Sequence, residues 1–359
     1  VISLGGCTAS FVSNQGLAVT NHHCAYGSIQ HNSTAANNLL AKGFLAKDLD
    51  EELPAAPGSK VFVTQEVTNV TAQINQELSP ALKGKERFDK IDELRKEQIA
   101  ACETPGYRCD VYSFHGGLEY YLIKQMEIRD VRLVHAPASG VGKFGGDIDN
   151  WMWPRHTGDY SFYRAYVGKD GQPAPYRSDN IPFVPPAFLK ISAKGVQAAE
   201  WVRVAGYPAR TYRHLTAAEL KRQFTQILPL AQQYRAEIIK VMQQVTAEDS
   251  AERQLYQPLL TSLIQRNNNT AALIRAYQSS ALQQRKEQQQ QALLQWIKAE
   301  PGRQARFMPA LLDLELFVQQ QSTNLQRDTL LQAFDSVQLF HAARRLYRNA
   351  QQQLKPDHE

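Results

Sequence analysis

A predicted hairpin that runs straight into two adjacent histidines is the feature that most constrains this chain. Apolar residues recur over 9–12, a turn-forming Asn-Gln-Gly follows at 14–16, and a second apolar run occupies 17–19. This pattern predicts two short antiparallel strands. The second strand leads into His22 and His23, and cysteines stand on either side of the hairpin. We therefore expect an antiparallel sheet that presents a histidine at the end of a strand.

Length and composition narrow the class of protein. The 359 residues are enough for about two domains, and 43% hydrophobic with 21% charged residues is typical of a globular protein. The net charge of +5 is mild, and no run of Lys and Arg is interleaved with aromatic residues, so we predict no nucleic-acid partner. No apolar run approaches the ~18 residues of a membrane span. Because neither an initiator Met nor a signal peptide is present, we expect the sequence to start inside a longer polypeptide.

The four cysteines fall into two close pairs, Cys7 with Cys24 and Cys102 with Cys109. Both spacings suit local disulfides, which would place the protein in an oxidising compartment. The alternative is four reduced thiols in a cytosolic protein. A zinc site would favour C-x-x-C spacing, which is absent, and adjacent histidines rarely face one ion. We therefore predict two disulfides, no metal site and no cofactor.

A change in composition and in apolar periodicity predicts an α+β protein of two domains. Residues 1–211 are mostly strand-like, with a helical insertion at about 72–101, and residues 201–208 end this β-rich part. Beyond about 211, Gly and Pro almost vanish and long helices rich in Gln, Ala, Leu and Arg follow, interrupted at 301–302. We predict a β-rich domain over 1–211 and a helical domain over 212–359.

A histidine and a carboxylate are the candidates for proton transfer. We favour His23 over His22 as general base because it immediately precedes Cys24, whose position a disulfide would fix. A carboxylate at the mouth of a strand, such as Asp159, can accept the Nδ1–H of a histidine and stabilise the imidazolium. The alternative is that these are loop histidines and a turn aspartate without a role. Two other carboxylates compete with Asp159 by spacing, Asp147 and Asp149.

A second group of candidate residues lies at 150–156, where two tryptophans, an arginine and a carboxamide are close together. Asn150 could accept a hydrogen bond from the α-ammonium of a peptide while Trp151 forms an apolar wall beside it. The alternative is a core loop with tryptophans packed beneath it.

No serine motif of the Gly-x-Ser-Gly or Gly-x-Ser-x-Gly type occurs in the sequence. The nearest approach is Ser139-Gly140, which precedes Asp159 in a predicted loop. A histidine and an aspartate without a serine cannot form an acyl-enzyme. If the triad is real, its third member is expected on sequence beyond these 359 residues.

Three segments, residues 7–12, 20–30 and 146–159, resemble bacterial dipeptidyl aminopeptidases of the dipeptidyl-peptidase 7 and 11 type, within the chymotrypsin-like serine peptidases. Residues 206–211 also fit. The resemblance implies a chymotrypsin-like β-barrel followed by an α-helical cap domain, in exported enzymes that are periplasmic or secreted and usually homodimers. These enzymes release dipeptides from free peptide N-termini by acyl transfer. They are roughly twice as long, so we expect this chain to hold part of one barrel and an incomplete helical cap.

The resemblance also assigns roles to residues. Carried onto this sequence, His23 is the general base and Asp159 its orienting carboxylate. Asn150 would bind the ammonium of the substrate, with Trp151 and Arg155 shaping that end of the cleft. The family uses a further asparagine from the helical domain, for which the candidates are Asn267, Asn268 and Asn269, with Asn268 chosen.

The leading hypothesis is a serine exopeptidase whose nucleophile lies on missing C-terminal sequence, so that these 359 residues alone hydrolyse nothing. The alternative is a non-catalytic peptide-binding protein that retains the groove without a nucleophile. A third hypothesis is an endopeptidase with an open cleft. In each case the expected partner is a peptide, with a free N-terminus under the first hypothesis.

Overall fold

The computed structural model describes residues 1–34, 36–146, 154–207, 213–247, 250–322, 324–334 and 337–354. The chain divides into two compact units, which we describe separately. One comprises Val1–Phe144 and His156–Ala209, and the other comprises Gly145–Arg155 and Arg210–Glu359. The domain bounds expected from the sequence, 1–211 and 212–359, stay a prediction.

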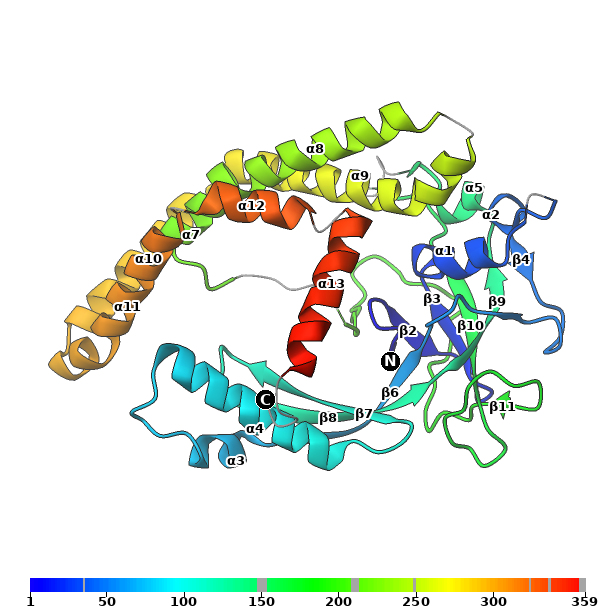
Figure 1. Cartoon of the computed structure of the whole chain (residues 1–359), viewed down its shortest axis with the longest axis horizontal. Coiled ribbons are helices and arrows are strands. Elements are labelled where there is room, and N and C mark those ends of the chain that lie inside the picture. The colour runs from blue at the N-terminus through cyan, green and yellow to red at the C-terminus, as the bar shows by residue number, and fades with distance from the viewer. Residues whose placement is uncertain are drawn as a thin grey trace. The chain divides into compact units, whose positions relative to one another are not determined.

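The first unit is built on one antiparallel sheet of eleven strands (Figure 1). The strands are β1 (Ile2–Ser3), β2 (Thr8–Phe11), β3 (Leu17–Thr20), β4 (Phe44–Leu45), β5 (Leu53–Pro54), β6 (Val61–Asn69), β7 (Tyr107–Phe114), β8 (Glu119–Ile128), β9 (Asp130–Ala136), β10 (Ser161–Val167) and β11 (Ile181–Pro182). They pair in the order β4-β9-β10-β3-β2-β1-β6-β8-β7, with β5 beside β9 and β11 beside β10. Among the described residues the ladder ends at β4 and β7. The predicted combination of antiparallel sheet and helices is confirmed. The sheet is not closed, and the expected partial chymotrypsin-like barrel stays a prediction.

The N-terminal hairpin forms as its sequence predicts. Strands β2 and β3 pair in antiparallel register, and their alternating residues Ala9, Phe11 and Ala18 enter the core. Gly16 in the turn has φ of +68°, and a Cβ atom there would lie 2.7 Å from the carbonyl oxygen of Ala165. Because both the backbone angle and the close approach exclude a side chain, the turn requires glycine.

Strand pairing then brings two distant parts of the sequence together. Ser161 at the start of β10 lies opposite Thr20 at the end of β3. Helix α1 (His22–His31) begins directly after β3. The segment that precedes β10, which contains Asp159, therefore lies at the same end of the sheet as the first turn of α1.

The predicted helical insertion is present as α3 (Thr71–Gln76) and α4 (Gly84–Cys102). These helices pack on the sheet over a small core of their own. A disulfide joins Cys102, the last residue of α4, to Cys109 in β7. Two further short helices are α2 (Leu39–Lys42) and α5 (Ser139–Gly142).

The second unit is mostly helical in the described residues from 217 to 354. Its helices are α7 (Ala217–Arg222), α8 (Leu228–Val245), α9 (Ala251–Gln278), α10 (Leu282–Lys298), α11 (Pro301–Ser322), α12 (Leu325–Phe334) and α13 (Gln338–Gln353), with a π-helical turn at Gln223–Ile227 between α7 and α8. The predicted interruption at 301–302 is the start of α11, where proline is favoured because the first helical N–H has no partner. Within the described ranges, none of the helices combines the length and apolar character needed to cross a membrane.

Candidate active site

The candidate base and its carboxylate, 136 residues apart, form a direct hydrogen bond. Nδ1 of His23 lies 2.8 Å from Oδ2 of Asp159. The His23 side chain is 64% exposed, whereas that of Asp159 is 19% exposed. This arrangement buries the carboxylate more deeply and leaves the imidazole open to solvent, where a substrate could reach it.

Asp159 is held by more than this one bond. Its Oδ1 accepts from the backbone N–H of His23 at 3.0 Å. The side-chain Nδ2 of Asn21 donates to Oδ2 at 3.1 Å and to the backbone oxygen of Asp159 at 3.2 Å. The carboxylate is therefore fixed by donors from both sides of the β3–α1 junction.

These donors decide the charge of Asp159. Burial alone would raise its pKa, but the hydrogen bonds from the His23 ring and backbone, the charge of His23 and the bond from Asn21 outweigh burial and hold the pKa below its ordinary value. An ionised carboxylate can only accept, so Nδ1 of His23 carries the proton of the shared bond. The neutral imidazole then has its lone pair on Nε2, the atom that a general base uses.

The first turn of α1 shows why the carboxylate lies here. Asn21 occupies the N-cap position of α1, yet its side chain makes no capping bond to the helix. The bond from the second helical N–H, that of His23, goes to Asp159 instead. A carboxylate at a helix N-terminus is favoured by the unpaired N–H groups and by the helix dipole.

His22 points away from this bond, into the protein. It is 1% exposed, and its Nε2 has no hydrogen-bond partner among the described residues. Burial is the main cause that lowers the pKa of His22, against the opposing effects of the Asp159 charge and a backbone hydrogen bond at Pro137. The His22 ring is therefore packed in the interior, whereas the ring of the adjacent His23 is exposed to solvent.

The His22 ring lies directly against Gly142 of α5. The same helix accepts from the segment before Asp159, because Thr157 Oγ1 donates to the Gly142 oxygen at 3.0 Å and the Gly158 N–H to the Val141 oxygen at 3.0 Å. His22 therefore packs against α5, which in turn binds the segment that precedes Asp159.

We predict that Gly142→Ala destabilises the fold by about 1–3 kcal/mol, because an added Cβ would lie 2.5 Å from Cδ2 and Cγ of the buried His22 ring. Urea unfolding measures the free energy. The matched control is Gly140→Ala in the same helix, where nothing lies within 4 Å of the added Cβ. Equal stability of the two variants would contradict this close packing of His22 on α5.

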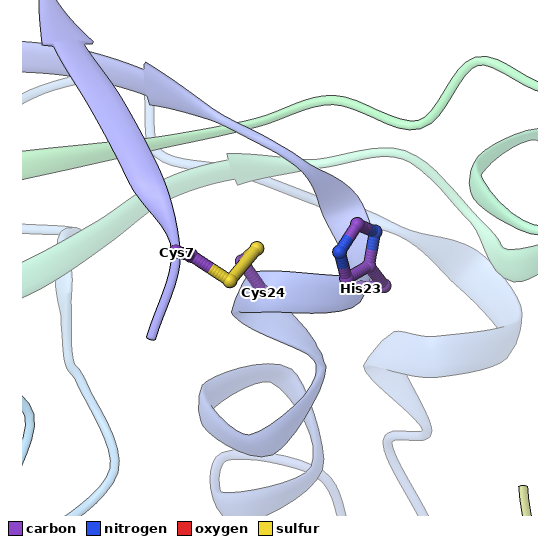
Figure 2. Close-up of side chains that lie close together, drawn as sticks. All are labelled: Cys7, His23 and Cys24. Atoms are coloured by element: carbon purple, nitrogen blue, oxygen red, sulfur yellow. A yellow bond between two sulfur atoms is a disulfide. The ribbon is translucent and has the colours of Figure 1, made fainter. Parts of the chain in front are cut away.

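A disulfide fixes the other side of the His23 backbone. Cys24 follows His23 in α1 and is bonded to Cys7, just before β2, with Cα atoms 6.2 Å apart (Figure 2). The two sulfurs and the His23 ring lie close enough to suggest a metal site. However, sulfurs bonded to each other are not the thiolates that bind zinc. The group offers only the imidazole as a ligand.

The other candidate residues have separate outcomes. Asn150 and Trp151, with the competing carboxylates Asp147 and Asp149, lie outside the described residues. Arg155 is exposed and belongs to the helical unit, as does Asn268, which is half-buried in α9. The adjacent Asn267 has a buried Oδ1 with no partner in the described part of the chain. The roles proposed for these residues remain predictions.

Asn21 is a polar group of the site that its sequence context does not indicate. An asparagine between a strand and a helix normally indicates an N-cap. The sequence therefore gives no reason to expect a bond from Asn21 to Asp159. Only the pairing of β3 with β10 reveals that bond.

Comparison with known proteins shows that the chain is similar to a class of peptidases. The chain is 42% identical to an Asp/Glu-specific dipeptidyl-peptidase of Shewanella putrefaciens, over 100% of this chain and 48% of that protein. It is 44% identical to dipeptidyl-peptidase 7 of Porphyromonas gingivalis, over 60% of this chain and 30% of the relative. The chain spans about half the length, or less, of these curated relatives.

The chain also matches solved structures of such a peptidase. The crystal structure of Porphyromonas endodontalis DPP11 in complex with the dipeptide Arg-Asp matches with a TM-score of 0.79 and 35% identity, over 94% of this chain and 48% of that one. The same protein in an alternate conformation matches with a TM-score of 0.61 and 36% identity, over 80% of this chain and 42% of that one. The sequence model of the peptidase S46 family matches residues 1–359, and the chain belongs to this family.

Proposed function

We propose that this chain carries the general base and the orienting carboxylate of a serine-type dipeptidyl aminopeptidase. The 2.8 Å bond between His23 Nδ1 and Asp159, made by a ring that is itself exposed to solvent, is the observation that supports this most directly. Membership of the peptidase S46 family and similarity to named dipeptidyl-peptidases support the same reaction.

In the proposed mechanism, Nε2 of His23 takes the proton of a serine hydroxyl as its oxygen attacks the peptide carbonyl. The protonated ring then gives this proton to the departing amine, which leaves an acyl-enzyme. Water repeats both steps and releases the dipeptide. Asp159 keeps Nδ1 protonated and stabilises the imidazolium during each transfer.

The serine is proposed to lie on sequence that follows Glu359 in the complete protein. In support, the chain contains no Gly-x-Ser-Gly motif and spans about half of its Shewanella relative. The open sheet would then be part of a chymotrypsin-like double barrel whose remaining strands the same sequence supplies.

Asn150, Trp151, Arg155 and Asn268 are proposed to bind the substrate at its N-terminal end. Capture of the ammonium there would place the second peptide bond at the serine, so that a dipeptide is released. We also propose an exported, periplasmic or secreted enzyme that forms a homodimer. Two disulfides support export, because they persist in oxidising compartments.

We predict that the protein expressed from its complete gene releases dipeptides from free peptides, whereas residues 1–359 alone release none. N-acetylation of the same peptides is expected to abolish cleavage, because it removes the ammonium. Mass spectrometry of the products measures both effects. The peptides carry either an acidic or an apolar second residue, since one relative is named Asp/Glu-specific and another carries no such name.

Each alternative predicts a different result in this experiment. Cleavage by residues 1–359 alone would show that the nucleophile lies within them. Cleavage of the acetylated peptides would favour an endopeptidase. Binding without cleavage by the complete protein would favour a peptide-binding protein.

A further inference from the structure

Asn21 stands at the junction between β3 and α1, one residue before His22. Its Nδ2 reaches both Oδ2 and the backbone oxygen of Asp159, at 3.1 and 3.2 Å. Both partners are oxygens that accept, so only the amide nitrogen of Asn21 fits this position. The bond therefore requires a donor at residue 21.

The N-terminus of α1 shows an exchange of roles. An asparagine at the N-cap normally accepts a bond from one of the first helical N–H groups. Here the Asn21 side chain makes no such bond, and Asp159 accepts from the His23 N–H in its place. The side chain that would ordinarily serve the helix is thus used to hold the carboxylate.

The bond from Asn21 matters because of how the donors are divided between the two carboxylate oxygens of Asp159. Oδ1 of Asp159 is held by the backbone of α1, and Oδ2 receives both Asn21 and the His23 ring. Without Asn21, no other side chain described in the structure except the His23 ring donates to this carboxylate. The carboxylate could then rotate, and Nδ1 of His23 would lose its fixed acceptor.

We propose that Asn21 is a positioning residue for the reaction, which acts by holding the Asp159 carboxylate in the plane that His23 Nδ1 requires. This inference rests on the proposed function, in which His23 is the base. Asn21 would then join His23 and Asp159 as a third polar group of the site. Its role is to hold Asp159 and not to contact the substrate or the nucleophile. Its effect is expected on the chemical step and not on substrate binding.

The test uses Asn21→Ala in the protein expressed from its complete gene. A bond to a charged group is worth enough that its loss should lower kcat by about 10- to 100-fold, with KM changed by less than about twofold. Asn21→Ser keeps a donor and is expected to recover part of kcat. Asn21→Asp keeps the size but places a second carboxylate against Asp159, and is expected to be the least active.

Asn32 supplies a matched control at the other end of the same helix. Its Nδ2 donates to the backbone oxygens of Ser28 and Pro54 and not to the site. Asn32→Ala removes one bond to α1, at Ser28, and one to Pro54 of β5, so it should cost stability while kcat remains within about twofold of the wild type. Equal loss of kcat in Asn32→Ala and Asn21→Ala would reduce Asn21 to a structural role and overturn the proposal.

A spectroscopic measurement separates the positioning role of Asn21 from the proposed function. The His23 Nδ1 proton should give a low-field NMR signal while its bond to Asp159 holds, and Asn21→Ala should weaken it, whereas Asn32→Ala should not. If the wild type releases no dipeptides but this difference is seen, only the proposed reaction fails. If dipeptides are released and Asn21→Ala keeps both kcat and the signal, only the positioning role fails.

Discussion

Replacement of His23 by alanine is expected to lower kcat/KM of the complete enzyme by at least about 10³-fold, as losses within catalytic triads do. The physical reason is that Nε2 of this ring is the base that the proposed mechanism requires. No other described side chain shares a hydrogen bond with Asp159 in the geometry of a base. The measurement is the steady-state hydrolysis of a dipeptide substrate, with folding checked by circular dichroism.

Two other histidines of α1 make this test specific. His31 is the exposed last residue of the helix, and His31→Ala should leave the rate unchanged within about twofold. His22→Ala should create a cavity and lower stability, because the ring is buried against Gly142. If the activity per folded molecule is lost in His22→Ala and retained in His23→Ala, the assignment of the base is wrong.

The local features of the site can be predicted from the sequence because short-range patterns determine them. The turn at 14–16 requires a glycine with positive φ, and the alternation around it sets which residues of β2 and β3 enter the core. Cysteines 17 and 7 residues apart are joined in the structure by local disulfides. The choice of His23 over its neighbour follows from its place beside one of these cysteines.

Features that depend on pairing between distant segments are harder to predict from the sequence. Residues 201–208 are expected to end the β-rich part, but 201–207 belong to no strand, and Trp201 and Val204 are almost fully exposed. Alternation reports that a strand could form but not that a partner strand is available for it. The strand order of the sheet likewise depends on pairing between distant segments.

The same limit explains Asn21. Its place before α1 indicates a helix cap, and no pattern in the sequence indicates that β10 will bring a carboxylate to within 3.1 Å of it. Because the cap explains Asn21 from its neighbours alone, its long-range bond to Asp159 goes unnoticed in the sequence. Searching N-cap positions for side chains that fail to cap is therefore a way to find such residues once a structure is known.

Replacement of Asp159 by asparagine should lower kcat by about 10⁴-fold, the magnitude seen when the orienting carboxylate of a triad becomes an amide. The amide removes the negative charge that stabilises the imidazolium. Its NH₂ group can also donate to Nδ1, which would move the ring proton to Nε2 and leave no base. Asp170→Asn is the matched control, because Asp170 is exposed and its Oδ1 accepts only from a nearby turn N–H, which an amide oxygen can also do.

Stability against acid gives this substitution a second readout that does not depend on activity. The pKa of Asp159 is lowered in the folded chain, so its ionised form stabilises the fold fully above the unfolded pKa of about 3.9. That contribution is lost as the pH falls through the lower folded value. The wild type should therefore be more stable than Asp159→Asn near neutral pH, and the difference should shrink below about pH 4. A difference in unfolding free energy that stays constant between pH 7 and pH 3 would mean that Asp159 is not held as a carboxylate by His23 and Asn21, and the proposed role of the pair would fail with it.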